Sequence, residues 1–311
     1  MVETVRNARS ERGRMGEKVR FAIRIMIFLL CAGIGFFSAY QIAEGAHTAS
    51  RYTPDTQLNS TNAILIDLES SAILLDHNGA DKMYPASMTK ILTAVVAMEH
   101  IRDLDEIVSL NEAIFQPIYN ENAATAGYMP GESVRAIDLL YGLLLPSGAE
   151  CAVGLAEYAA GSESAFVKLM NDKAREIGMK GSNFTNTTGL HDRNHYSTAM
   201  DIAILFQYAL ANDTFYEMIT SARYSAPATN RHADGVTFYS SFFSRITSPA
   251  LDGGRILGGK TGYTNEAGQC LASFAVKNGR QYILVTSGAA GNNQTQKLHI
   301  DDAFAVYGAL R

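Results

Sequence analysis

The order of predicted secondary structure along the chain constrains its fold more than any other feature. Residues 63–79 hold two short apolar runs, and the second ends at the turn signal Asn78-Gly79, which predicts a β-hairpin. Near the other end of the chain, apolar segments joined by short turns predict three consecutive strands and a closing helix. The strands span residues 255–263, 269–279 and 280–290, and the helix spans 296–310.

The middle of the chain is predicted to be helical. A helix is expected over residues 84–100, and helical periodicity recurs in 133–145, 150–160, 164–178 and 198–210. Strands at both ends with helices between them predict an α+β fold. In this fold both ends of the chain complete an antiparallel sheet flanked by helices, and an all-helical lobe is inserted. We expect a functional site in the cleft between the lobe and the sheet.

The N-terminal segment predicts a membrane-associated leader. Residues 21–43 form an apolar run, and about 20 such residues suffice to cross a bilayer. Seven basic residues stand against three acidic ones in the first 24, which favours a cytoplasmic flank over a nucleic-acid partner. We therefore expect a basic cytoplasmic tail (1–20), a transmembrane segment (21–43), a linker (44–60) and an exported domain (61–311). The small residues of Ala43-Glu44-Gly45 leave open whether the segment is a signal anchor or a cleaved signal peptide.

The composition fits a folded exported domain. The chain has 311 residues, of which 47% are apolar and 18% charged. Cys31 lies in the apolar run, and Cys151 and Cys270 are too few for a disulfide framework, so we expect two buried free thiols in the domain. The residues after Lys260 suffice only for the closing strands and helix, so no further domain is expected there.

The first chemical motif is the pair Ser87 and Lys90. Pro85 precedes the predicted helix, so Ser87 lies near its N-terminus, where free N–H groups and the helix dipole favour negative charge. Lys90 follows three residues later on the same face, among apolar residues that lower the pKa of a lysine and allow it to act as a base. The motif pairs a nucleophile with a base, although the spacing alone is also typical of an ordinary helix.

Two further motifs contain residues suited to substrate binding. Ser147 stands where Pro146 and Gly148 interrupt an apolar segment, and it either reaches into a cleft or caps the following helix. On a predicted strand, Lys260 supplies a cation for a substrate carboxylate and Thr261 a hydroxyl group. Gly262 removes a side chain, so an extended substrate can lie against the strand.

These motifs together resemble the active-site signature of penicillin-recognising serine enzymes. The residues in and around the motifs are most similar to those of the serine-type D-alanyl-D-alanine carboxypeptidases, the low-molecular-mass penicillin-binding proteins of peptidase family S11. The matching stretches are YPASMTK, DLLYGLLLPSG, HYSTAMDIA and GGKTGYT, and the resemblance covers residues 53 to 311. It implies a β-lactamase/transpeptidase-like fold and a location at the bacterial cell membrane, with the catalytic domain outside the cytoplasm, or secreted if the leader is cleaved.

The resemblance also implies a role for each motif residue. Ser87 attacks the bond between the terminal D-alanines of a peptidoglycan stem peptide, Lys90 takes its proton, and Ser147 passes a proton to the leaving amine. Lys260 and Thr261 hold the peptide carboxylate, and the backbone N–H groups of Ser87 and Tyr263 form the oxyanion hole. β-Lactams are expected to acylate Ser87, and neither a metal nor a cofactor is expected.

One position departs from the family pattern. Ala149 and Glu150 follow Ser147-Gly148, and Ala149 stands where the family usually has asparagine. Loss of an amide that contacts substrate costs about 1 to 3 kcal/mol unless Glu150 or water replaces it. A weakly active or inactive penicillin-binding or wall-sensing protein therefore remains an alternative.

Two other enzyme classes are alternatives to a carboxypeptidase. A serine β-lactamase would share Ser87, Lys90 and Lys260 but needs a dedicated deacylating base, and no glutamate stands in a recognisable motif for one. A zinc peptidase would have to use His191 and His195. These histidines lie outside any His-Glu-x-x-His motif, and we expect them to be loop residues.

Overall fold

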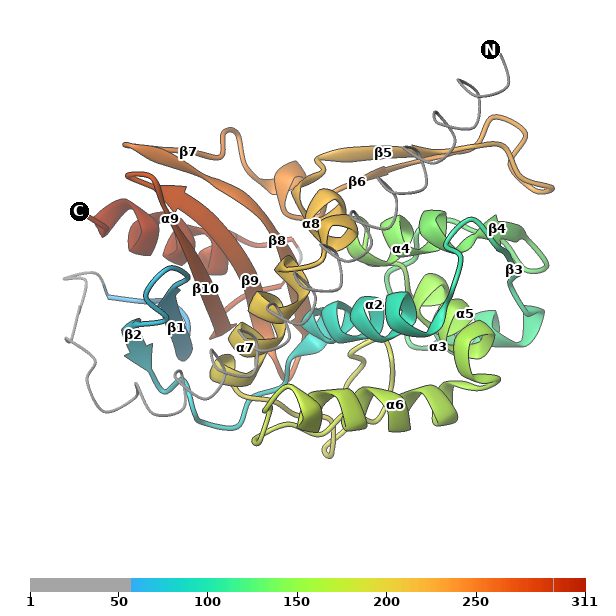
Figure 1. The fold of residues 1–311 in the computed structure, drawn as a ribbon, viewed down its shortest axis with the longest axis horizontal. Helices are drawn as coiled ribbons and strands as arrows, with labels where there is room; N and C mark the ends of the chain where they lie inside the picture. Colours follow the sequence, from blue (N-terminus) through green and yellow to red (C-terminus); the bar gives the residue numbers. More distant parts are fainter. Residues whose placement is uncertain (1–56, 293) are drawn as a thin grey trace, which may run out of the picture. The chain divides into compact units, whose positions relative to one another are not determined.

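The central element is a six-stranded antiparallel sheet with the strand order β2-β1-β10-β9-β8-β7 (Figure 1). Its strands are β1 (Asn62–Asp67), β2 (Ile73–His77), β7 (Ala250–Leu251), β8 (Gly254–Thr264), β9 (Gly268–Lys277) and β10 (Arg280–Ala289). The first and last strands pair along their length, with Asn62 opposite Ser287. The predicted hairpin, the three closing strands and the completion of the sheet by both ends are therefore confirmed.

The computed structural model describes residues 57–292 and 294–311, which all belong to one compact unit. The predicted cytoplasmic tail, the apolar segment with Cys31 and most of the linker lie outside these residues. Within the described ranges, no helix has both the length and the apolar character that a membrane span needs.

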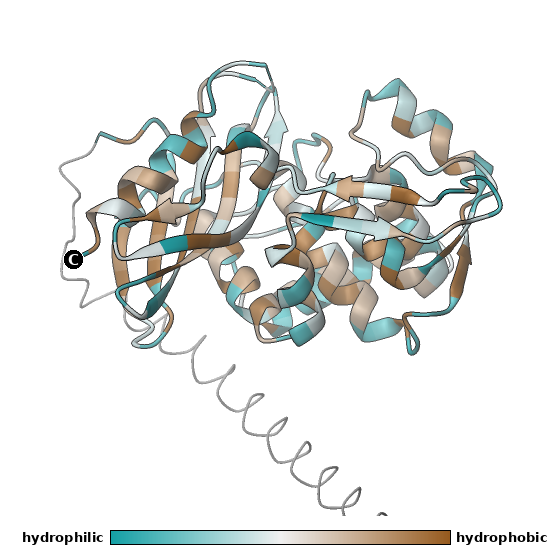
Figure 2. Ribbon diagram, turned by 90° about the horizontal axis from the view of Figure 1, so that it is seen from above, coloured by the Kyte–Doolittle hydropathy of each residue, from teal (hydrophilic) through white to brown (hydrophobic). Residues whose placement is uncertain are grey.

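Helices cover both faces of the sheet. The described helices are α2 (Thr89–His100), α3 (Phe115–Asn120), α4 (Ala136–Leu144), α5 (Ala149–Ala160), α6 (Glu163–Glu176), α7 (Ala199–Leu210), α8 (Asp213–Thr220) and α9 (Leu298–Ala309). Successive residues of β1 enter different cores, because strand side chains alternate between the two faces. Ala63 and Leu65 pack with α9, whereas Ile64 and Ile66 join the larger core beneath α2 and α7. Figure 2 shows apolar residues along the strands of the six-stranded sheet.

The inserted lobe is not all-helical, which corrects the prediction. It also carries a ribbon of β3 (Ile107–Ser109) and β4 (Ser133–Arg135) and a second ribbon of β5 (Arg223–Ala226) and β6 (Val236–Tyr239). The predicted helix over 133–145 is wrong in its first three residues, because Val134 pairs with Val108 and α4 begins only at Ala136. Pairing with a distant strand overrides the local helical pattern.

The two cysteines of the described domain are both buried and free, as expected. Cys151 lies on α5 and Cys270 on β9. Since both thiols are enclosed by the cores, neither serves as a disulfide bridge between elements. The domain is held together by its cores and its sheet.

Candidate active site

Ser87 lies in a 3-10 turn, η1 (Ala86–Met88), that leads directly into α2. The turn is enclosed by β8 on one side and by the loop around Gly189 on another. A methyl group at Gly262 would stand 3.1 Å from the Ser87 nitrogen, and one at Gly189 would stand 1.8 Å from the Ala86 oxygen. Glycine at both positions lets these backbones approach, so the half-buried Ser87 is held in a narrow space between strand and loop.

Lys90 is the second residue of α2, three positions after Ser87, and contacts that serine directly. Its Nζ is 3.2 Å from Ser87 Oγ and donates to the Thr188 carbonyl oxygen at 2.7 Å. Burial lowers the pKa of Lys90 to about 8, although the nearby charge of Glu150 opposes this effect. A lysine with such a pKa is partly neutral near physiological pH, and its free lone pair can then accept the proton of Ser87.

Ser147 and Lys260 form the second pair of the site. Lys260 Nζ donates to Ser147 Oγ at 2.9 Å and to the Thr261 carbonyl oxygen at 3.0 Å. Ser147 has a left-handed backbone with φ of 74°, and helix α5 is capped by Gly148 without a side-chain hydrogen bond. Ser147 therefore faces the lysine, and the capping alternative does not apply.

Lys260 lies on β8, and its side chain is fully buried. Burial lowers its pKa well below the usual value, and the positive charges of Lys90 and Arg245 lower it further. Three basic side chains, those of Lys260, Lys90 and Arg245, thus influence one another's charge in the site. A bound carboxylate would compensate them, since an opposite charge favours the ionised form of a lysine.

The Lys260–Thr264 part of β8 has an open edge. On one side it pairs with β9, with Gly262 opposite Cys270, whereas β7 pairs only with Gly254 and Arg255. Along the rest of that edge no strand of the described residues is its neighbour. An extended peptide can add there as a further strand. The side chain of Tyr263 donates to Asn265 Oδ1 at 2.8 Å.

Several contributors to the site carry no recognisable sequence signal. Thr188 anchors Lys90 through a carbonyl oxygen, which any residue possesses. Ser241 shares a hydrogen bond with Thr261, with 2.8 Å between the two hydroxyl oxygens, although the residues lie 20 positions apart. Arg245 lies four positions after Ser241, and its positive charge lowers the pKa of Lys260. Gly189, with φ of 81°, is the one residue whose type could have indicated a special turn.

Ala149 and Glu150 begin helix α5 and are both fully buried. Glu150 Oε1 accepts hydrogen bonds from the backbone N–H groups of Ala126, Gly127 and Tyr128 at 2.7, 2.9 and 3.3 Å. The carboxylate of Glu150 is thus engaged by the loop before β4. It does not take the place of the side-chain amide that the family usually has at position 149.

Of the two histidines of the zinc alternative, His195 is buried and His191 is exposed. The Nε2 of His195 lies 2.8 Å from Thr89 Oγ1, and its Nδ1 accepts from the Thr185 N–H at 3.2 Å. Burial lowers its pKa to about 4. His191 meets the ring of Tyr84 edge-on at 4.7 Å between centroids. Among residues 57–292 and 294–311, no three His, Cys, Asp or Glu side chains gather as a candidate metal site.

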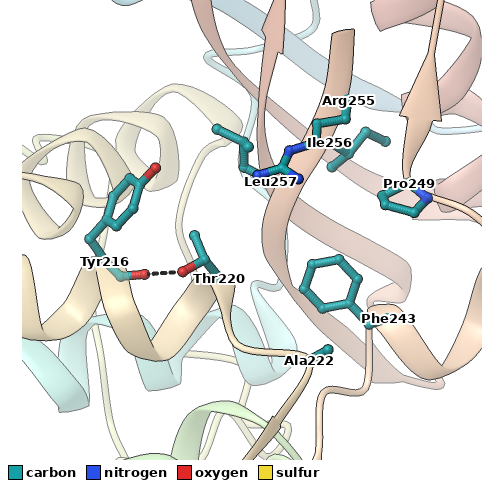
Figure 3. A pocket seen from close by; sticks show the side chains of 8 residues that line it. All are labelled: Tyr216, Thr220, Ala222, Phe243, Pro249, Arg255, Ile256 and Leu257. Carbon is teal, nitrogen blue, oxygen red and sulfur yellow. Dashed lines mark hydrogen bonds between the residues drawn. The ribbon is translucent and has the colours of Figure 1, made fainter.

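A separate cavity of about 380 Å³ lies between α8, β7 and the start of β8 (Figure 3). Tyr216, Phe243 and Arg255 contribute to its lining, together with smaller apolar groups. None of the residues of the three sequence motifs lines it. The candidate active site is therefore defined by the Ser87–Lys90 and Ser147–Lys260 contacts rather than by the cavity.

The fold belongs to the transpeptidase-like class of α+β proteins. It superimposes on the Streptomyces K15 DD-transpeptidase with a TM-score of 0.72 at 24% identity, covering 82% of this chain and 99% of the other. Residues 47–291 match the peptidase S11 family, described as D-alanyl-D-alanine carboxypeptidase. The chain is a member of this family, which confirms the resemblance found in the sequence.

Individual relatives carry the same description. The D-alanyl-D-alanine carboxypeptidase DacF of Bacillus subtilis is 34% identical over 281 residues, which cover 87% of this chain and 67% of the relative. The crystal structure of a D-alanyl-D-alanine carboxypeptidase from Mycobacterium tuberculosis is similar with a TM-score of 0.71 and 27% identity. That match covers 83% of this chain and 93% of the other.

Proposed function

We propose that this protein is a serine D-alanyl-D-alanine carboxypeptidase that acts on peptidoglycan stem peptides through an acyl-enzyme on Ser87. The observation that carries the proposal is the 3.2 Å contact between Lys90 Nζ and Ser87 Oγ. Because burial lowers the pKa of Lys90 to about 8, the nucleophile stands beside a base of suitable strength. The family membership supports the same chemistry.

Acylation follows from this contact. Neutral Lys90 takes the proton of Ser87, and Oγ forms a bond to the carbonyl carbon of the penultimate D-alanine. The negative charge on the carbonyl oxygen is stabilised by the backbone N–H groups of Ser87 and Tyr263. When the C–N bond breaks, Ser147 passes a proton to the nitrogen of the terminal D-alanine, which leaves, and the proton held by Lys90 replaces the one that Ser147 gave up. The remaining peptide is then an ester of Ser87.

The third motif positions the substrate for this step. The peptide lies along the open edge of β8. Gly262 lets the Ser87 turn approach this strand, because a methyl group there would stand 3.1 Å from the Ser87 nitrogen. Lys260 and Thr261 hold the terminal carboxylate, and the charge of that carboxylate raises the pKa of Lys260 again. Binding at the carboxylate end places the scissile carbonyl group next to Ser87.

Hydrolysis completes the cycle. Water attacks the ester carbonyl group, the shortened peptide leaves, and Ser87 regains its proton. A β-lactam is a second ligand of this site, since its amide carbonyl group acylates Ser87 in the same way and its ester is released slowly. The peptide and the β-lactam thus compete for one serine, and neither step calls on a metal or a cofactor.

A second candidate function is that of a penicillin-binding or wall-sensing protein with little turnover. The observation that favours it is the burial of Ala149 together with the engagement of Glu150 by residues 126–128. Without the usual amide, a substrate group in the cleft loses a hydrogen-bond partner. The loss of one such bond lowers the rate about tenfold to a hundredfold.

One experiment separates these functions. The full-length protein is incubated with a peptide ending in D-Ala-D-Ala, and released D-alanine is measured with and without a fluorescent penicillin. We expect release that penicillin blocks and that Ser87→Ala and Lys260→Ala abolish or strongly reduce. Labelling of Ser87 without release of D-alanine would support the binding protein. Rapid loss of the penicillin label would support a β-lactamase, and release that persists in Ser87→Ala but stops with EDTA would support a zinc peptidase.

We also propose that the domain acts outside the cytoplasm, attached to the membrane through residues 21–43. The apolar run and its basic flank support this location. Cell fractionation followed by N-terminal sequencing tests it. Full-length protein in the membrane fraction supports an anchor, and a mature N-terminus near Gly45 supports a cleaved leader.

A further inference from the structure

Glu150 is buried beside the candidate active site without belonging to any of the three motifs. Its side chain is fully enclosed, Oε1 accepts three backbone N–H groups from residues 126–128, and Oε2 has no hydrogen-bond partner among the described residues. A buried carboxylate is costly unless it is hydrogen-bonded. A stability role for α5 alone does not explain it, because the three N–H groups belong to a different segment.

The segment that Glu150 holds packs directly on the Ser147 turn. The Ala149 N–H donates to the Ala124 carbonyl oxygen at 2.8 Å. A methyl group added at Gly148 would stand 2.8 Å from the Ala126 side chain and 3.0 Å from its nitrogen. Residues 124–128 therefore close one side of the turn, at the point where it passes into α5.

This turn needs external support because of its backbone conformation. Ser147 adopts a φ of 74°, a region that non-glycine residues occupy only when the surrounding structure imposes it. On the other side, the Gly148 N–H donates to the Gly142 carbonyl oxygen at 2.8 Å, which ties the turn to α4. The contacts from α4 and from residues 124–128 together orient Ser147 Oγ toward Lys260 Nζ at 2.9 Å.

We propose that Glu150 is a positioning residue that clamps residues 126–128 over the Ser147 turn and thereby orients Ser147 for acylation. This inference rests on the proposed function, since Ser147 is the proton-transfer residue of that mechanism. Glu150 touches neither substrate nor nucleophile. It acts on Ser147 through a chain of backbone contacts, which is separate from the effect of its charge on the pKa of Lys90. The clamp needs a hydrogen-bond acceptor at the end of the side chain, which a glutamine also provides.

The kinetic test is a double-mutant cycle in the full-length protein, read at pH 9.5 as the second-order rate constant of acylation by a fluorescent penicillin. At this pH Lys90 is mostly neutral in every variant, so the effect of the Glu150 charge on the pKa of Lys90 does not enter the comparison. We expect Glu150→Ala to lower this rate constant about tenfold to a hundredfold, and Glu150→Gln to stay within about threefold of wild type. In a Ser147→Ala background, Glu150→Ala should lower the rate constant less than about twofold, because the side chain that Glu150 positions is already absent. Glu157→Ala, on the same helix, is the control and should leave the rate constant unchanged.

Two kinetic outcomes would overturn the clamp. One is an equal loss from Glu150→Ala with and without Ser147, which would mean that Glu150 acts independently of that serine. The other is a loss in Glu150→Gln as large as in Glu150→Ala, since glutamine keeps the acceptor. Thermal unfolding of each variant, monitored in parallel, ensures that only folded protein is compared.

A second measurement does not depend on activity. Amide hydrogen exchange of residues 126–128 should be at least about tenfold faster in Glu150→Ala than in wild type, and unchanged in Glu150→Gln. Exchange along β9 should be the same in all three proteins. If penicillin fails to acylate the wild type, the proposed function is wrong, while the exchange data still decide the clamp. If the amides of 126–128 stay protected in Glu150→Ala, the clamp itself is wrong.

Discussion

Lys90 Nζ lies 3.2 Å from Ser87 Oγ and 2.7 Å from the Thr188 carbonyl oxygen. One buried amine therefore connects the turn that carries the nucleophile with a loop 98 positions later in the chain. The carbonyl oxygen accepts one N–H of the lysine, and the lone pair of neutral Lys90 is left for the proton of Ser87. This arrangement leads directly to a pH-dependent prediction.

Acylation of Ser87 by a penicillin should become faster as the pH rises, with a half-maximal rate near pH 8. Lysine is a base only when it has lost its proton, and burial lowers the pKa of Lys90 to about 8. Lys90 is then neutral in about a tenth of the molecules at pH 7 and in about half of them at pH 8. Stopped-flow acylation between pH 6 and 9.5 measures the profile.

The controls for this profile are two lysine variants. Lys90→Ala should lower the rate by about a hundredfold or more and remove the pH dependence, in line with the usual contribution of a general base. Lys168→Ala, an exposed lysine on α6, should leave the profile unchanged. A flat wild-type profile would show that Lys90 is not the base.

Lys260→Met should lower kcat/KM for a peptide ending in D-Ala-D-Ala about a hundredfold or more. Loss of one partner of a buried charge pair costs about 3–5 kcal/mol. The wild type should also prefer the free carboxylate over the C-terminal amide of the same peptide, and this preference should disappear in the variant. Steady-state release of D-alanine from both peptides measures it. Lys277→Met, a second buried lysine of the sheet, should keep the preference.

Gly189→Ala should abolish most activity, because the added methyl group would stand 1.8 Å from the Ala86 oxygen and push the Ser87 turn aside. Gly161→Ala is a matched control: it has a similar φ of 78° but no atom within 4 Å of the new methyl group. Both variants should lose about 1–2 kcal/mol of stability from the left-handed backbone. Activity that survives in Gly189→Ala as well as in Gly161→Ala would show that the turn is not held by that loop.

Ser241→Ala should lower kcat/KM about twofold to tenfold. The variant removes one hydrogen bond to Thr261, and such a bond contributes about 0.5–1.5 kcal/mol. The effect should appear mainly in KM, since in the proposed mechanism Thr261 holds the carboxylate away from the reacting bond. Ser225→Ala removes a comparable bond to Thr237 on the exposed ribbon and should leave kcat/KM unchanged. A purely kcat effect would argue against this role of Thr261.

The periodicity of the sequence was sufficient to predict the strands at both ends and most helices, and the motifs with their neighbouring residues were sufficient to recognise the family. Apolar residues at helical or strand spacing reflect burial, and the motif residues carry their chemistry in their side chains. Segments whose structure depends on a distant partner were not predictable in this way. Ser133–Arg135 continue a helical pattern, yet they form a strand because β3 supplies the pairing.

Within the candidate site, the residue types came from the sequence and their arrangement came from the tertiary structure. Lys90 and Ser87 are neighbours on one turn, so their spacing alone predicts the contact. Ser147 and Lys260 are 113 positions apart, and only the tertiary structure brings their side chains to 2.9 Å. The left-handed backbone of Ser147 and the role of Glu150 toward residues 126–128 likewise depend on contacts between distant segments. Local patterns cannot encode them, because they arise only when the sheet and the inserted lobe pack together.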